Sequence, residues 1–178
     1  MKNILKIVSI ALVSVFTLSA ATCFGQSGGG GRTLNSAEDL KKYFESQPAN
    51  RSDNPIKVTI NANDQTIKDI AEVIKYSDKY VSLNLSGNAL TTIPNNAFRR
   101  SETLVGVTIP NSVTGIRGMA FEGCYSLDSI TFEGANTIIS GGFPEDFGDL
   151  LTKYLAGGRG KYKKIAGVHR SSVWTKQN

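Results

Sequence analysis

The chain of 178 residues has few of the side chains that carry redox, metal or acid–base chemistry. It contains two cysteines, Cys23 and Cys124, and one histidine, His169. Cys23 lies close to the N-terminus, so the body of the chain holds no pair of cysteines and a disulfide-stapled domain is excluded. No C-x-x-C, H-E-x-x-H or phosphate-loop pattern occurs, and His169 has no nucleophile or metal ligand near it in the sequence. We therefore expect a protein that is not an enzyme and has no cofactor or metal site.

The chain also lacks an apolar run near its start that is long enough for an ordinary transmembrane helix. The run from Ile7 to Leu18 is shorter than the ~20 residues that such a helix needs. Lys2 and Lys6 precede it, and the small residues of 19–21 follow it. This order of a charged region, an apolar region and a cleavage zone predicts a secretory signal peptide over residues 1–22, which is not part of the fold.

Cys23 follows the small residues directly, as the acylated cysteine of a bacterial lipobox does. Ala20 and Thr22 differ from the residues usual in that motif, which are Leu and Gly or Ala. The glycine-rich stretch Gln26 to Gly31 has the composition of a flexible spacer. We predict that residues 23–32 form a lipid anchor and linker, so that the protein is exported and held at the cell envelope or outer-membrane surface. The alternative is an ordinary cleavage site, which would leave the chain secreted or periplasmic.

Residues 80–127 are organised by a repeat of 23 residues. This offset superposes Ile93 on Ile116, Ala97 on Ala120, Phe98 on Phe121 and Leu104 on Leu127. A fixed period of this length is typical of repeat proteins, in which each unit buries one face against its neighbours. The residues predicted to be buried for this reason are Ile93, Phe98, Leu104, Ile116, Phe121, Cys124 and Leu127.

The first repeat fits the consensus L-x-x-L-x-L-x-x-N-x-L, with Tyr80, Leu83, Leu85, Asn88 and Leu90 at its marked positions. Leu83 and Leu85 share one face of a short strand, because side chains alternate at period two. We expect Asn88 to turn its amide inward and pair with bent backbone groups.

The second repeat reads V-T-I-P-N-S-V-T-G-I from Val107 and A-F-E-G-C-Y-S-L from Ala120. These two blocks resemble the BspA-like, treponemal-type leucine-rich-repeat surface lipoproteins of oral anaerobes and spirochaetes. The resemblance implies a right-handed solenoid with a parallel sheet on one side. It also implies adhesion, through binding to extracellular-matrix proteins or to partner bacteria.

The predicted fold class is α/β: a short leucine-rich-repeat solenoid with parallel strands on one face. Residues 33–79 are expected to form an N-terminal cap of a helix after Ser36, a strand at Ile56–Ile60 and a helix over 64–76. Repeats of about 23 residues follow over 80–150, with a match that degrades after Phe132. Residues 151–178 are expected to form a basic cap with a hairpin that turns near Ala166.

The C-terminal part differs from the rest in charge. Residues 150–178 hold seven basic residues and no acidic one, whereas residues 23–149 hold eleven basic and fifteen acidic residues. A basic segment flanked by aromatic residues could bind acidic glycans or nucleic acid, and the alternative is a solvated cap rich in lysine. Export and the lack of a nucleic-acid motif argue against nucleic acid.

The candidate binding residues are the outward positions of the expected strands, which are small and polar: Lys57, Thr59, Ser82, Asn84, Gly106, Thr108, Ser129 and Thr131. Two functions remain open. The first is a surface lipoprotein that binds a protein partner, in the extracellular matrix or on another bacterium. The second is an envelope-structural or periplasmic scaffold without a host ligand. We treat the strand face and the basic segment as two separate candidate surfaces and favour the strand face.

Overall fold

The computed structural model describes residues 33–141, 143, 147–166 and 171–178. The predicted signal peptide, the linker, Cys23 and His169 lie outside the described residues. The described elements are, in order, β1 (Thr33–Leu34), α1 (Ala37–Glu45), β2 (Ile56–Asn61), α2 (Ile67–Lys75), β3 (Val81–Ser86), β4 (Thr92–Ile93), β5 (Leu104–Ile109), β6 (Gly115–Ile116), β7 (Ser129–Phe132), β8 (Ile138–Ile139), α3 (Leu150–Gly157), β9 (Gly160–Ala166) and β10 (Val173–Gln177).

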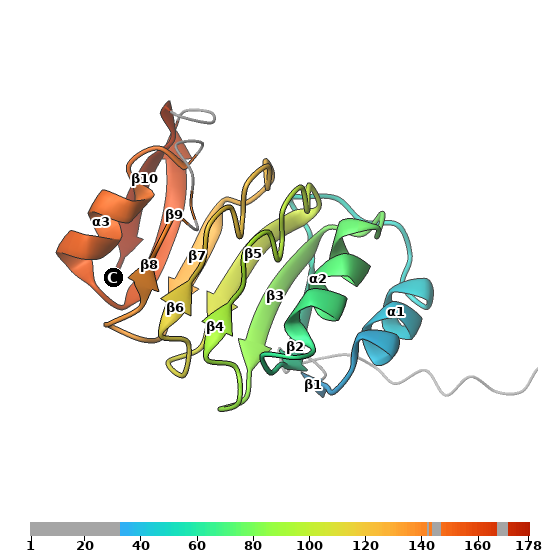
Figure 1. Ribbon diagram of the computed structural model, residues 1–178. Coiled ribbons are helices and arrows are strands. Elements are labelled where there is room, and N and C mark those ends of the chain that lie inside the picture. The colour runs from blue at the N-terminus through green and yellow to red at the C-terminus, as the bar shows by residue number, and fades with distance from the viewer. Residues whose placement is uncertain (1–32, 142, 144–146, 167–170) are drawn as a thin grey trace, which may run out of the picture. The chain divides into compact units, whose positions relative to one another are not determined.

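Two sheets organise these elements. The large sheet has the order β1-β2-β3-β5-β7-β9-β10, and the small sheet has the order β4-β6-β8. Neighbouring strands from β1 to β7 are parallel, while β9 runs antiparallel to β7 and β10 antiparallel to β9. The small sheet and the helices α1 and α2 lie on one side of the large sheet (Figure 1). The expectation of a mixed α/β fold built on a parallel sheet is confirmed.

Each repeat contributes one strand to each sheet. In the small sheet, Ile93 pairs with Ile116 and Ile116 with Ile139, so the period of 23 residues persists into the third repeat. Pro110 follows β5 directly, and this strand ends there because proline has no N–H for the ladder.

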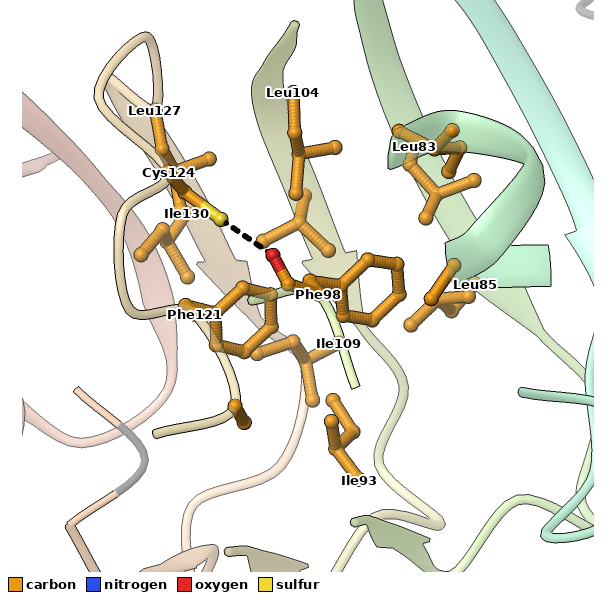
Figure 2. Close-up of a cluster of buried hydrophobic side chains, with 14 of the residues drawn as sticks. Leu83, Leu85, Ile93, Phe98, Leu104, Ile109, Phe121, Cys124, Leu127 and Ile130 are labelled. Atoms are coloured by element: carbon orange, nitrogen blue, oxygen red, sulfur yellow. Dashed lines mark hydrogen bonds between the residues drawn. The ribbon is translucent and has the colours of Figure 1, made fainter. Parts of the chain in front are cut away.

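The core lies between the two sheets and continues under the helices. All seven repeat residues that the period assigns to the interior are buried: Ile93, Phe98, Leu104, Ile116, Phe121, Cys124 and Leu127. The rings of Phe98 and Phe121 stack with centroids 5.2 Å apart, and Phe121 stacks on Phe143 at 5.0 Å. Figure 2 shows the first of these stacks among the leucines and isoleucines of β3, β5 and β7. Phe143 lies one residue short of the period, and the stack extends beyond Phe132, where the sequence match degrades.

The turns between the sheets repeat as closely as the core does. Asn96 and Met119, one period apart, both have left-handed backbone, with φ of 59° and 58°. Hydrogen bonds join these turns from one repeat to the next, from Asn96 N–H to Gly118 O at 3.1 Å and from Met119 N–H to Gly141 O at 2.8 Å. Stacked turns therefore hold successive repeats in register on the side opposite the large sheet.

Side chains that accept hydrogen bonds from backbone N–H groups lie just before each of the N-terminal helices. The Ser36 hydroxyl accepts a bond from Asp39 N–H at 3.0 Å and starts α1. Asn63 and Thr66 bond to each other's backbone in a turn before α2, which is why this helix begins at Ile67 rather than at Asp64. Ile67, Ile70, Ala71 and Ile74 are fully buried on one face of α2.

The expected orientation of Asn88 is wrong, because its side chain is exposed. Asp64 satisfies the bend that follows, accepting bonds from Thr91 N–H at 2.8 Å and Thr92 N–H at 3.1 Å. The Thr91 hydroxyl donates to the same carboxylate at 2.6 Å. The bent backbone is thus paired from the preceding segment of chain, and no inward amide is needed.

The C-terminal segment contains the helix α3, which the sequence analysis did not predict. Leu150 and Tyr154, one turn apart, bury its inner face, and the Tyr154 ring lies 4.2 Å from that of Phe132. The Tyr154 hydroxyl accepts a bond from Thr137 N–H and donates one to Gly134 O, at 3.0 and 3.2 Å. The antiparallel pair of β9 and β10 follows, with Tyr162 and Trp174 buried. No helix among the described residues is long and apolar enough to cross a membrane.

Candidate functional site

The candidate site is the side of the large sheet that faces away from the core, called the outward face here. The register of the strands arranges its central residues in two rows. The first row is Lys57, Ser82, Gly106, Ser129 and Lys163, and the second is Thr59, Asn84, Thr108, Thr131 and Lys161. All the residues that the sequence analysis assigned to this face lie in these two rows.

A β-bulge sets the register of the rows. Val81 pairs with Leu104, but Ser82 pairs with Gly106, so Val105 is an extra residue in β5. A strict offset of 23 residues would place Asn84 opposite Val107, whose side chain is buried. The bulge shifts the pairing by one residue and brings Thr108 beside Asn84 on the outward face.

The middle of the outward face is polar, uncharged and partly exposed. Ser82, Asn84, Thr108, Ser129 and Thr131 are all half-buried in the sheet surface. The Asn84 amide donates to the Thr59 hydroxyl at 3.3 Å across neighbouring strands. Short hydroxyl and amide side chains such as these offer both donors and acceptors to a ligand laid across the strands.

The first row has no side chain at Gly106, and the Ser82 side chain lies against the backbone there. A Cβ atom built there would come within 2.9 Å of the Ser82 Oγ atom, and the residue itself is buried.

Two lysines of the basic segment, Lys161 and Lys163, belong to the same face, so the separation of these two lysines from the strand face in the sequence analysis is wrong. β9 lies beside β7, so Lys163 pairs with Ser129 and Lys161 with Thr131. Between them Tyr162 points inward and is buried, because side chains alternate along a strand. The lysines therefore extend the two rows.

These lysines are a part of the site that sequence reasoning missed. The signal that could have found them is the alternation Lys161-Tyr162-Lys163, which is typical of a strand with one buried face. Lys57, at the other end of the first row, is also exposed. Among the described residues, none of the three lysines has an ion-pair partner within 4.0 Å.

A separate, concave feature is a groove of about 640 Å³ between α1 and α2. Phe44, Val73 and Tyr76 contribute its apolar lining, and Glu45, Asp69, Glu72 and Asp78 make its rim predominantly acidic. Tyr76 is 74% exposed. The groove lies on the side of the molecule that carries the helices, away from the outward face.

Cys124 is a packing residue in this structure. It is 3% exposed, and its thiol donates to Phe98 O at 3.0 Å, the dashed line in Figure 2. Burial raises the pKa of the Cys124 thiol to about 12, so the thiol is protonated and unreactive at neutral pH. Across the described ranges, no three His, Cys, Asp or Glu side chains gather into a group that could hold a metal ion.

Comparison with known proteins agrees with this geometry. Residues 53–144 match a family model described as a BspA type leucine rich repeat region (6 copies). No curated protein and no solved structure matches the chain. The matched range runs from just before β2 to the end of the phenylalanine stack, and so contains the parallel strands from β2 to β7 and the whole small sheet. The chain belongs to the BspA-type leucine-rich-repeat family.

Proposed function

We propose that this protein is an exported, lipid-anchored binding module that captures a protein partner on the outward face of its large sheet. The partner is an extracellular-matrix protein or a surface protein of another bacterium, so the activity is adhesion rather than catalysis. The observation that carries this proposal is the outward face, where short polar side chains from successive repeats lie in register and no described element covers them. Leucine-rich-repeat proteins use such extended faces for binding.

In this proposal the described residues form a short solenoid that is closed at both ends. β1 and β2 extend the sheet before β3, with α1 packed on α2, while the pair of β9 and β10, with α3 against it, follows β7. Repeat proteins need such terminal units, because an open end would expose apolar side chains of the core. Phe132 and Phe143 would be exposed without Tyr154, Tyr162 and Phe147 against them.

The binding test uses uncharged bulk on the outward face. The triple variant Asn84→Tyr, Thr108→Tyr and Thr131→Tyr keeps residues that suit a strand but fills the second row with rings. We expect it to fold and to lose capture of matrix proteins and bacterial surface proteins in a pull-down. The matched control carries tyrosine at three exposed helix positions, Lys41, Lys68 and Glu72, and should capture as well as the unmodified protein. Equal capture by the triple variant would overturn the proposed site.

The anchor is tested separately at Cys23. Acylation of this cysteine would tether the sheet to the membrane through the glycine-rich linker. We expect metabolic labelling with palmitate to label the protein, and Cys23→Ala to abolish the label and release the chain from membranes. Cys124→Ala is the control and should keep the label, because its buried thiol cannot reach an acyl donor. An unlabelled wild-type chain would contradict the anchor.

Surface display separates this proposal from the alternative of a periplasmic or envelope-structural scaffold. Protease added to intact cells can cut only a chain that is displayed outside. We expect loss of the protein from intact cells at protease levels that leave a periplasmic marker untouched. Protection of the protein until the cells are opened would favour the scaffold.

A further inference from the structure

The first row of the outward face has a nearly symmetric composition. Reading across the sheet from β2 to β9, it runs lysine, serine, glycine, serine, lysine: Lys57, Ser82, Gly106, Ser129 and Lys163. Within this stretch Lys57 and Lys163 are cations, Ser82 and Ser129 carry hydroxyls, and the centre is a glycine. Thr175 of β10 continues the row beyond Lys163. No carboxylate occupies either of the two rows.

The symmetry depends on the fold and is not visible in the linear sequence. Gly106 reaches the row only because Val105 is the extra residue of the bulge, and Lys163 reaches it only because β9 turns back beside β7. The row spans four strand intervals, which place the two lysine backbones about 19 Å apart at the usual spacing of ~4.8 Å.

From this row we propose the chemistry of the partner, an inference that rests on the proposed function. The structure assigns to the first row an extended peptide segment of the partner protein that crosses the strands and carries an acidic side chain near each end. Its carboxylates pair with Lys57 and Lys163, its backbone lies over Gly106, and Ser82 and Ser129 bond to its peptide groups.

Three features favour a peptide over other anionic ligands. The row is positively charged near both ends and uncharged in the middle, which fits a ligand with two separated carboxylates. A sulfated polysaccharide carries negative charge on every unit, and its central charges would have no partner in the row. Ser82 and Ser129 each offer a donor and an acceptor, as a peptide backbone requires. Six residues of extended chain span about 20 Å, which matches the distance between the lysines.

The probe is a fluorescently labelled peptide, Glu-Glu-Ser-Gly-Ser-Gly-Ser-Glu-Glu, titrated with the purified full chain in detergent and followed by anisotropy. Two control peptides have the same length. One replaces every glutamate with glutamine, and the other groups all four glutamates at one end. We expect the spaced peptide to bind about tenfold more tightly than the glutamine control, the ratio that two ordinary exposed ion pairs provide, and about threefold more tightly than the grouped control, which keeps one of the two pairs.

The variants test the row itself. Lys57→Gln with Lys163→Gln should weaken the spaced peptide about tenfold and erase its advantage over the grouped peptide. The matched control, Lys41→Gln with Lys68→Gln, removes the same charge from the helix side and should leave the affinity unchanged. Gly106→Ala adds a methyl group at the centre of the row and should weaken the peptide as well. The Ser82 side chain can rotate away from the new methyl group, and a thermal melt verifies that this variant is folded.

The outcomes separate this inference from the proposed function. Equal binding of the spaced and grouped peptides, or equal loss in the helix-side control, overturns the peptide row. Tighter binding of a heparin oligosaccharide than of the spaced peptide, through the same lysines, also overturns it and assigns the row to a glycan. In either case the proposed function stands if the triple tyrosine variant loses its partner, and it fails if that variant still captures it.

Discussion

The inward and outward sides of the same strands differ in which residues they carry and in what those residues are expected to do. On the inward side Leu83, Val107 and Ile130 are neighbours in the sheet and are nearly interchangeable apolar residues. On the outward side the neighbours Asn84, Thr108 and Thr131 are all polar, and Lys161 and Lys163 of β9 continue the rows. The inward side fixes the repeat by burial, which requires only shape and apolarity. We expect the outward side to contribute little to stability, so that its residues can be those that a ligand requires.

The largest loss of stability is expected on the inward side, when one ring of the phenylalanine stack is removed. Phe121 is fully buried between Phe98 and Phe143, so Phe121→Ala leaves a cavity with stacked rings on both sides. We expect a loss of about 3–5 kcal/mol in the free energy of unfolding, which could unfold so short a repeat protein. Denaturant unfolding measures it, with Leu155→Ala, 74% exposed, as the control. A melting temperature within about two degrees of wild type would show that the stack does not hold the repeats.

The next largest loss of stability is expected when the hydrogen-bonded hydroxyl of Tyr154, near the C-terminal end, is removed. Tyr154→Phe removes the hydroxyl that pairs with Thr137 N–H and Gly134 O. Because Thr137 is buried, its N–H would be left without a partner, and we expect a loss of about 1–3 kcal/mol. Tyr76→Phe, at an exposed ring, is the matched control and should change nothing. Equal unfolding curves for Tyr154→Phe and wild type would mean that water replaces the hydroxyl.

Removal of the buried hydroxyl of Ser101, at the position equivalent to Cys124, should stabilise the protein, whereas the two preceding substitutions destabilise it. Ser101 lies one period before Cys124 and is fully buried, but its Oγ atom has no hydrogen-bond partner among the described residues. We expect Ser101→Ala to stabilise the protein by about 1 kcal/mol, because it removes an unpaired polar group. Ser126→Ala, at a partly exposed serine, is the control. A destabilised Ser101→Ala variant would show that the hydroxyl finds a partner in solution.

The bend held by Asp64 predicts a small stability effect that depends on pH. Hydrogen bonds from the Thr91 hydroxyl and from the N–H groups of Thr91 and Thr92 lower the pKa of the Asp64 carboxyl. The stabilisation that these hydrogen bonds provide is therefore complete at pH values above the unfolded pKa of about 3.9. It is lost as the pH falls through the lower pKa of the folded state. Asp64→Asn should cost less than about 1 kcal/mol at neutral pH, because the site is exposed. The difference from wild type should vanish in acid, and a difference that is constant with pH would contradict this assignment.

The smallest effect on stability is expected on the outward face. Thr108→Ser leaves the core untouched, and we expect a change within about 0.5 kcal/mol. The inward partner in the same strand, Val107→Ala, should cost several times more, because Val107 is 2% exposed. Chemical unfolding of the two variants side by side gives the ratio. Similar losses would mean that the outward face also serves the fold.

Much of the fold could be predicted from the period, because buried apolar residues must recur wherever repeats stack. Phe98, Phe121 and Leu127 were placed in this way. The orientation of Asn88 and the helix α3 could not be predicted from the period. The Asn88 prediction relied on a consensus, while the actual partner of the bend, Asp64, comes from the preceding segment. The helix α3 is marked by only two buried residues, Leu150 and Tyr154, and the first of them also fits the repeat.

The candidate site was predicted only in part, for a related reason. Alternation along each strand is local, so Thr59, Asn84 and Thr131 could be assigned to the outward side from sequence. The order and offset of strands are set by the whole fold. Neither the bulge at Val105 nor the return of Lys163 beside Ser129 follows from a local pattern.

The central claim is that the outward face, and not the side with the helices, contacts the partner. The most direct test is an NMR map of backbone amide shifts when a captured partner is added to the isotope-labelled protein. The account predicts that the largest shifts cross the sheet through Ser82, Asn84, Thr108, Ser129 and Thr131 and reach Lys161 and Lys163. Shifts gathered instead around Phe44, Val73 and Tyr76, in the groove between α1 and α2, would contradict it.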